Sequence, residues 1–281
     1  MKNLITTYRL HMKVLMLVSV IAVLITGCVS NQLISLEEEG ILTKHPIRIM
    51  DSTNLGKFTF RGQISRSDRE RASFSDDLSE NDSTSFSHFT FKIPKYQFNG
   101  EAEITIDDHV AFLGGLSLGK IGGQEYLETH LGAAFFSVYE KNSIRFDVGA
   151  KHQKLNYKLT YGTYVHHFLS NEELLEIVEV NSSSENVNLY LGFTVNRNNN
   201  EDFANFFLSY LLSYQTYFDH KGDASTSGFK LNGAMHTISL GLFKNIESFG
   251  RILIGARKML MSFEFGYTAP FDLFLQYDFS L

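Results

Sequence analysis

The chain has 281 residues, with 25 Phe, 13 Tyr and 21 Gly but only 3 Pro and no Trp. A formal net charge of -6 without a basic cluster excludes nucleic-acid binding, because phosphates would repel such a chain. The single cysteine excludes an internal disulfide and any multi-cysteine metal site. Abundant aromatic residues and glycine favour strands and tight turns, and an all-β domain of this size can be a single unit.

Residues 1–27 are predicted to be a cleavable signal peptide. An uncharged apolar run, residues 14–25, directly follows the positive flank at Lys13. The run is shorter than the roughly twenty residues that a transmembrane helix needs, and it has the length of a signal peptide's apolar region. Translation can begin at Met1 or at Met12, since Met12 starts a more usual signal sequence.

The apolar run ends in Ile25, Thr26, Gly27 and Cys28. This sequence resembles the lipobox of bacterial lipoproteins, in which small residues precede a cysteine that is acylated and becomes the new N-terminus. The resemblance implies a diacylglycerol group and palmitate-type acyl chains on Cys28, which stabilise membrane anchoring by about 0.8 kcal/mol per buried methylene. The alternative is an incidental cysteine at the end of an ordinary secretory signal or membrane anchor.

Val29 follows Cys28, in place of the Asp that marks retention at the inner membrane in many Gram-negative lipoproteins. The resemblance therefore implies transfer to the outer membrane. Residues 28–54 are predicted to be the lipidated N-terminus and a solvated tether, because residues 31–54 lack a clear period and contain the acidic run Glu37-Glu38-Glu39.

Residues 55–281 are predicted to form one β domain. In residues 57–64, Phe58, Phe60 and Ile64 share one face while polar residues share the other, which is the two-residue period of a half-buried strand. The same alternation recurs in residues 101–107, 143–151, 186–196 and 261–268. Less regular strands are expected at residues 86–91, 109–119, 130–139, 157–167, 204–218, 237–243, 251–258 and 271–281, which gives about ten to thirteen strands in all.

Three stretches lack this two-residue period. Residues 65–85 and 219–227 are rich in small polar and charged residues and are predicted to be mobile loops. Residues 170–180 are predicted to form a short helix, because Ser170 with Glu173 resembles a capping box and the apolar residues follow at helical spacing.

Alternation alone does not distinguish a soluble β domain from an outer-membrane barrel, since only the environment of the apolar face differs. Arg145 and Asp147 on the polar face suit a narrow hydrated lumen as well as a wet surface. The chain end favours the barrel: apolar residues alternate with polar ones up to Leu281. This resembles the C-terminal strand signal of outer-membrane β-barrel proteins, although members of that class usually end in Phe or Trp.

We therefore expect an antiparallel up-and-down β-barrel of 10–12 strands of the outer-membrane type, with Cys28 and the end of the last strand on the same, periplasmic side. The alternative is a lipid-anchored soluble periplasmic barrel or sandwich that binds an apolar ligand or an envelope partner. The lumen of so small a barrel would be largely filled by side chains, which disfavours a wide pore.

No catalytic, cofactor-binding or metal-binding constellation is recognised in the sequence. His166 and His167 are adjacent in a predicted strand, so their side chains point to opposite faces. The other candidates, which match no hydrolase or phosphate-loop motif, are Ser87 with His88, His236 with Ser239, Gly114-Gly115 and Gly122-Gly123. The glycine pairs are expected to relieve crowding or to bend the sheet.

The sequence thus predicts an outer-membrane lipoprotein of a Gram-negative bacterium with a structural, transport or surface-binding role and no recognised enzymatic activity. Its expected partners are membrane lipid, through Cys28 and the barrel surface, and the envelope export and insertion machinery. The sequence determines neither a substrate, nor a biological process, nor the oligomeric state.

Overall fold

The computed structural model describes residues 28–40, 43–50, 58–75, 88–166, 173–198, 205–220, 229–246, 250–262 and 270–281. The predicted signal peptide lies outside these residues. Within them, no helix is long and apolar enough to cross a bilayer. The strands are β1 (Cys28–Glu39), β2 (Phe58–Ser67), β3 (Arg71–Ser75), β4 (His88–Lys92), β5 (Tyr96–Thr105), β6 (Val110–Ile121), β7 (Gln124–Tyr139), β8 (Asn142–His166), β9 (Glu173–Arg197), β10 (Asn205–His220), β11 (Phe229–Ile246), β12 (Gly250–Ser262) and β13 (Phe271–Ser280).

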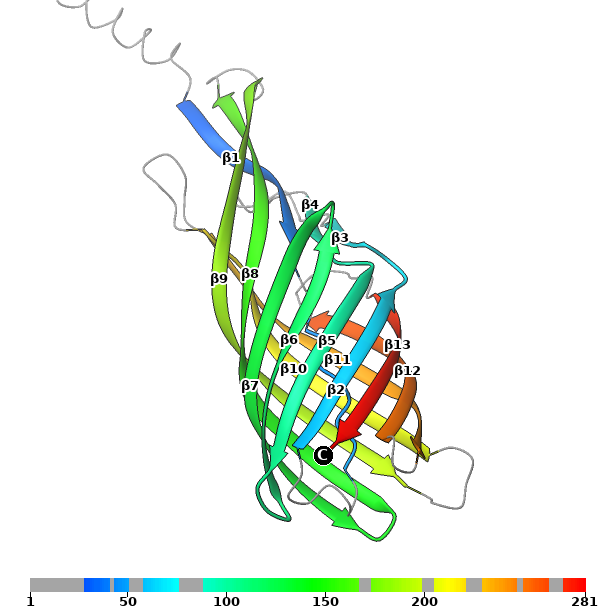
Figure 1. Cartoon of the computed structure of the whole chain (residues 1–281). Helices are drawn as coiled ribbons and strands as arrows, with labels where there is room; N and C mark the ends of the chain where they lie inside the picture. The colour runs from blue at the N-terminus through cyan, green and yellow to red at the C-terminus, as the bar shows by residue number, and fades with distance from the viewer. Residues whose placement is uncertain are drawn as a thin grey trace, which may run out of the picture.

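A closed antiparallel barrel is the centre of the fold (Figure 1). Around the wall the order is β2, β5 through β13 in sequence, and then β2 again, because β13 pairs with β2. Except for the pairs β2–β5 and β13–β2, each wall strand pairs with its neighbour in sequence. Closure pairs both edges of every strand, so no open edge remains in the wall. The predicted all-β, up-and-down barrel is confirmed.

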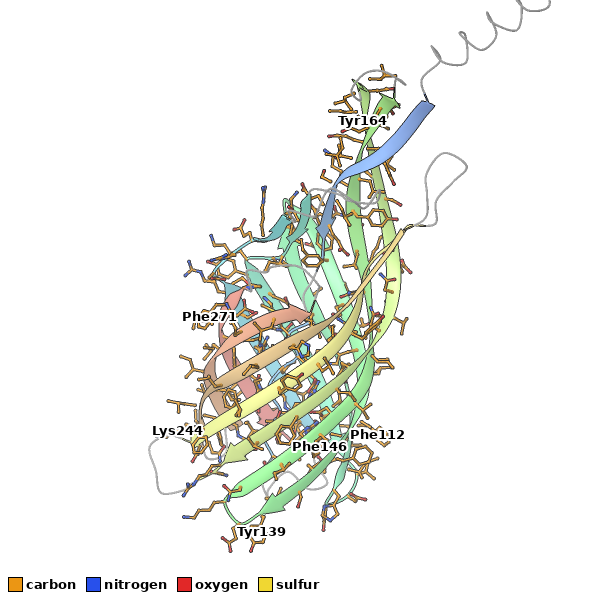
Figure 2. All side chains as sticks on the ribbon, turned by 180° about the vertical axis from the view of Figure 1, so that it is seen from behind. Phe112, Tyr139, Phe146, Tyr164, Lys244 and Phe271 are labelled. Atoms are coloured by element: carbon orange, nitrogen blue, oxygen red, sulfur yellow. The ribbon has the colours of Figure 1, made fainter. Side chains whose placement is uncertain are left out.

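The wall carries apolar side chains outside and polar side chains inside. In β2, Thr59, Arg61 and Gln63 are buried in the lumen, whereas Phe58, Phe60 and Ile64 are exposed on the outer surface. The aromatic rings of Phe112 and Phe146, labelled in Figure 2, are likewise about half exposed. The two-residue period is therefore kept, but its apolar face is the outer one.

β8 and β9 are longer than their neighbours and project beyond the barrel at one end (Figure 1). β7 pairs with residues 142–153 of β8, and β1 takes its place beside residues 156–166. β4 lies parallel to β1, and β3 pairs with β4. We call β1, β3, β4, residues 154–166 of β8 and residues 173–186 of β9 the extension.

The polarity of β8 reverses where the extension begins. In the barrel, its outward residues include Ile144 and Phe146, and its inward residues include Arg145. In the extension, the inward residues are Leu155, Tyr157 and Leu159, which are buried, and the outward ones are Lys154, Asn156 and Lys158. The outer face of β8 therefore changes from apolar in the barrel to polar in the extension.

The extension has an apolar interior of its own, to which Leu36, Phe91 and Leu155 contribute. Glu38 is fully buried there, and no described group forms a hydrogen bond with either carboxylate oxygen. Burial raises the pKa of the Glu38 carboxyl well above its ordinary value, so the folded protein favours the neutral form.

Two local expectations are wrong. The solvated tether is wrong because residues 28–39 form β1 and residues 43–50 are buried inside the barrel. The predicted helix at residues 170–180 is wrong because residues 173–180 belong to β9, whose backbone pairs with β8. That ladder satisfies the backbone groups of both strands, and this long-range pairing outweighs the local helical spacing.

The boundaries of the predicted loops also shift. Residues 65–67 end β2, residues 71–75 form β3, and residues 219–220 end β10. Residues 76–85 and 221–227 of the predicted loops, and residues 263–268 of a predicted strand, lie outside the described residues.

Cys28 and the end of the final strand lie at opposite ends of the barrel, contrary to expectation. Cys28 pairs with His166 at the tip of the extension, whereas Ser280 pairs with Thr59 at the other end. Figure 1 accordingly places the C-terminus at the base and the start of β1 at the top. The reason is that the chain passes through the barrel between β1 and β2.

Candidate functional site

The interior of the barrel is occupied by residues 43–50, which we call the plug. The plug has no regular secondary structure, and all eight of its residues are buried. A segment placed between two strands in sequence thus fills the space that the wall encloses.

Luminal side chains satisfy the backbone of the plug. Gln276 accepts a hydrogen bond from the Ile47 amide at 2.7 Å and donates one to the Ile47 carbonyl at 2.6 Å. Asn196 bonds the amide and the carbonyl of Met50 in the same way, at 3.4 and 3.2 Å. Further donors are Arg251 to the Ile49 carbonyl, at 3.0 Å, and Arg257 to the His45 carbonyl, at 3.1 Å. These bonds meet the requirement that buried backbone groups be paired.

Apolar plug residues cover the apolar parts of the inner wall. Ile47 and Ile49 belong to a buried cluster whose other members are Phe207, Phe243, Leu253 and Phe274. Met50 belongs to a second cluster, with Ala111, Leu113, Ala134 and Phe136. Burying a side chain of this size contributes about 1.5–3 kcal/mol, so these contacts favour the seated plug.

Charged plug residues pair with the wall. Lys44 lies 2.8 Å from Asp272. Arg48 donates to both carboxylate oxygens of Glu101, with its Nε at 2.9 and 3.0 Å, and its Nη1 lies 3.4 Å from Asp147. Removing one partner of such a buried pair leaves an uncompensated charge, which makes these contacts essential to the closed lumen.

The same acidic residues also hold wall arginines. Arg61 contacts Glu101 and Glu103, both at 3.1 Å. Arg145 contacts Glu103 at 2.6 Å and Asp147 at 2.8 Å. Positive and negative groups thus alternate across β2, β5 and β8, and Arg48 inserts into that arrangement from the plug.

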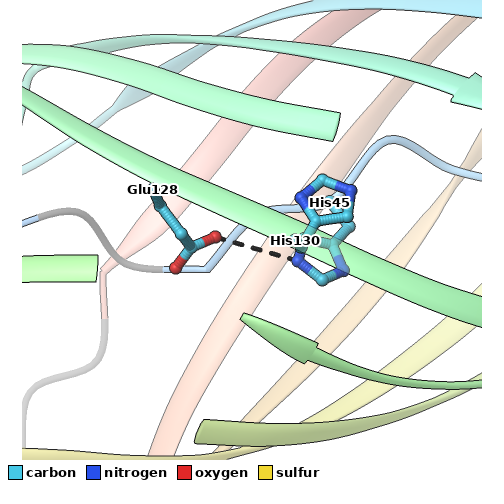
Figure 3. A group of neighbouring side chains, drawn as sticks. All are labelled: His45, Glu128 and His130. Atoms are coloured by element: carbon cyan, nitrogen blue, oxygen red, sulfur yellow. Dashed lines mark ion pairs between the residues drawn. The ribbon is translucent and has the colours of Figure 1, made fainter. Parts of the chain in front are cut away.

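A cluster of three potential metal ligands lies beside this network (Figure 3). His45 comes from the plug, and Glu128 and His130 come from β7. The two imidazole rings stack at 4.0 Å between centroids, and His45 Nε2 lies 3.8 Å from Glu128 Oε1. Glu128 Oε2 accepts a hydrogen bond from Thr43 at 2.8 Å, and the edge of Tyr190 contacts His45 at 4.5 Å between centroids.

Glycines on the inner wall make room for these rings. A Cβ atom on Gly115 would lie 2.7 Å from His130 Cε1, and one on Gly132 or Gly149 would lie 2.3 or 2.4 Å from the Tyr190 hydroxyl. Gly115 therefore relieves crowding as predicted. Gly122 and Gly123 form the turn between β6 and β7, with φ values of 55° and 95° that favour glycine.

Of the candidate pairs named from the sequence, His236 and Ser239 are not brought together. The side chains of His236 and Tyr210 form a hydrogen bond of 2.6 Å on the outer face. Ser239 is buried in the lumen, where its hydroxyl accepts a hydrogen bond from Arg257 at 3.2 Å. Cys28 begins β1 and His88 begins β4. Ser87 and His167 lie outside the described residues.

Sequence reasoning missed His45, Arg48 and the rest of the plug. The available signal was indirect: acidic and basic residues at alternate positions of adjacent strands, such as Glu101, Glu103 and Arg145, need partners when they face inward. Nothing in the spacing of residues 43–50 identified those partners.

Replacing Arg48 by Met tests the plug contacts. Met keeps much of the side-chain volume but leaves Glu101 and Asp147 without the plug cation, so the free energy of unfolding should fall by about 3–5 kcal/mol. Chemical denaturation in detergent measures this value. The control is Arg69→Met, which removes an exposed ion pair with Asp68 at 3.7 Å and should cost less than about 1 kcal/mol. Equal effects of the two variants would contradict the assignment of Arg48.

No protein-family model matches the chain, and no curated protein has significant sequence similarity to it.

Proposed function

We propose that this chain is an integral outer-membrane lipoprotein of a Gram-negative bacterium, with a structural or surface-binding role and a lumen closed by its own plug. The observation that carries the proposal is the reversed polarity of the wall. Every wall strand has an exposed apolar residue on its outer face: Phe60, Ile104, Leu116, Leu131, Phe146, Leu191, Leu208, Leu240, Ile254 and Leu275.

The size of this apolar surface fits a bilayer. Along β9, the outward residues from Val187 to Val195 are all apolar, and charged or polar residues, including Glu185, follow in the extension. A tilted strand crosses the hydrocarbon layer in about 9–11 residues, so the apolar stretch has nearly the required length. Soluble proteins rarely expose a continuous apolar surface of this extent.

The alternative, a soluble barrel that carries an apolar ligand, has less support. Its interior would need an apolar cavity, but the described lumen is lined by charged and amide side chains and filled by the plug. Its outer face would leave an apolar band in water, which is unfavourable by about 25 cal/mol per Å².

The filled lumen also favours a structural or surface-binding role over transport. Plug backbone, plug charges and apolar plug residues are all matched by groups on the wall, so passage of a solute would require the plug to leave. The extension is the part best placed to bind a partner, since it projects from the barrel and the outward side chains of its β8 part are polar.

The connections suggest the orientation. At the end near Ser280, the connections after β5, β7 and β11 span two to four residues, and the one after β9 spans seven. At the other end, β6 joins β7 through residues 122–123, but the connections after β8, β10 and β12 span six to eight residues, and β2 leads to β5 through β3 and β4. Outer-membrane barrels have short periplasmic turns and longer extracellular loops, which favours an extension on the outside of the cell.

This orientation also places Cys28 on the outer side. Exposed Leu174, Leu175 and Ile177 lie near it on β9, because Ser30 pairs with Tyr164 and Tyr164 with Leu174. The acyl group and these side chains make the tip a second lipid-contacting point. The extension must incline towards the membrane surface for the tip and the barrel wall to contact the same bilayer.

Arginine substitutions on the outer face separate the membrane barrel from the soluble one. Leu240 is 59% exposed in the middle of β11, and Ile106 is 58% exposed in the turn after β5. In a bilayer, Leu240→Arg should destabilise the barrel by about 2–4 kcal/mol and Ile106→Arg by about 0–1 kcal/mol. Folding into lipid vesicles, followed by the different gel migration of folded and boiled protein, measures the effect. Equal tolerance of both substitutions would favour a soluble protein.

Growth with labelled palmitate tests the lipid on Cys28. The wild-type protein should carry the label, and Cys28→Ser should lose it completely while still migrating as a folded barrel, because the wall does not depend on the acyl group. A mature wild-type protein with an unmodified cysteine would contradict lipidation.

An impermeable maleimide reagent tests the orientation, since acylation leaves the chain without a free thiol. Glu185→Cys in the extension should be labelled on intact cells, and Lys141→Cys in the turn before β8 only after the outer membrane is permeabilised. The opposite pattern would place the extension in the periplasm.

A further inference from the structure

The cluster of His45, Glu128 and His130 joins the plug to the barrel wall. One ligand atom from each residue can be chosen so that all three lie within 4.8 Å of one another, and all three residues are buried (Figure 3). The wall network described above accounts for the carboxylates and guanidinium groups around them. It leaves both ring nitrogens of His45 and Nδ1 of His130 without a hydrogen-bond partner among the described residues.

His130 makes a hydrogen bond to a carboxylate of the kind that metal-binding histidines make. Its Nε2 lies 3.0 Å from Glu101 Oε2, which is a hydrogen bond in which the ring donates to the carboxylate. That bond fixes the tautomer and leaves a lone pair on Nδ1, which has no hydrogen-bond partner among the described residues. Histidine ligands of metals commonly donate their second ring N–H to a carboxylate in this way.

His45 supplies the second independent observation. The residue is 4% exposed, and within the described part of the chain neither ring nitrogen has a hydrogen-bond partner. Buried polar groups are normally satisfied, so an imidazole in this position points to a ligand. Glu128 faces it, with Oε1 at 3.8 Å from His45 Nε2.

We infer that His45, Glu128 and His130 bind a divalent transition-metal ion, with Zn²⁺ as the best match, and that this ion fastens the plug to β7. Two imidazoles and one carboxylate form a donor set typical of zinc. Zinc bonds of about 2.0–2.2 Å bring ligand atoms closer together than 4.8 Å, so the stacked rings must rotate slightly on binding. Water completes the coordination.

The surrounding charges can accommodate the ion. Glu128 binds it directly, and Glu101 balances charge through His130. Lys151, 3.7 Å from Glu128, and Arg48 lie nearby and oppose a further positive charge, which will limit the affinity without removing the site. The ion fastens the plug whether or not the barrel lies in lipid, so the inference does not rest on the membrane assignment.

Metal stoichiometry tests the inference directly. The full mature chain carrying Cys28→Ser, which removes the thiol as a competing ligand, is folded in detergent, saturated with ZnCl₂, desalted and analysed by mass spectrometry for bound zinc. One Zn²⁺ per folded chain is expected, together with a higher melting temperature that is lost on adding a chelator. In the same background, His45→Gln and His130→Gln should each weaken binding by at least about tenfold.

The matched control is His236→Gln, which alters a histidine bonded to Tyr210 on the outer face and should keep one Zn²⁺ per chain. Different migration of folded and boiled protein establishes that each variant is folded. If neither histidine variant folds, Co²⁺ is added to the parent protein. Binding at the site then shows as a change in the visible spectrum of Co²⁺, because histidine ligation alters that spectrum. The inference is overturned if the folded parent binds no zinc and shows no histidine–Co²⁺ spectrum. It is also overturned if folded histidine variants retain full zinc. Neither outcome bears on membrane insertion.

Discussion

Charges enclosed in the barrel have to be paired, and the plug supplies part of that pairing. Arg48 lies between Glu101 and Asp147, which also hold Arg61 and Arg145. An isolated buried charge costs several kcal/mol, so neither the wall network nor the plug is stable in this arrangement without the other. The apolar patches of the inner wall add to the same dependence, since the plug's isoleucines cover them.

The path of the chain follows from this dependence. Because residues 43–50 descend through the lumen, β1 lies at one end of the barrel and β2 begins at the other. β1 then continues the sheet beside β8 where β7 has ended. The extension and the plug are thus parts of a single N-terminal path, and closing the lumen also determines where Cys28 lies.

Alternation in the sequence predicted the strands and the barrel well. Residues 58–64, 101–105 and 143–151 of these predicted strands lie in strands of the wall, because a two-residue period survives whichever face is buried. The direction of the faces was not predictable from the period, since a lipid-facing side and a core-facing side have the same composition. Only the positions of Arg145 and Asp147 hinted at a polar interior.

The plug and the extension could not be predicted from the sequence, for physical reasons. Residues 43–50 pair with side chains distant in sequence rather than with a neighbouring strand, so they have no local period. The helical spacing of Leu174 and Ile177 was misleading, because β9 is fixed by its ladder with β8. His45 and His130 are separated by most of the N-terminal half, and only folding brings their rings together.

The central claim is that lipid contacts the outer face of the wall and not its inner face. The chain contains no tryptophan, so single tryptophans can report their own surroundings. Tryptophan at Leu240 and at Phe207 would be compared in vesicles whose acyl chains carry bromine, which quenches fluorescence on contact. The account predicts strong quenching at Leu240 and little at the luminal Phe207, and equal quenching or none at either position would contradict it.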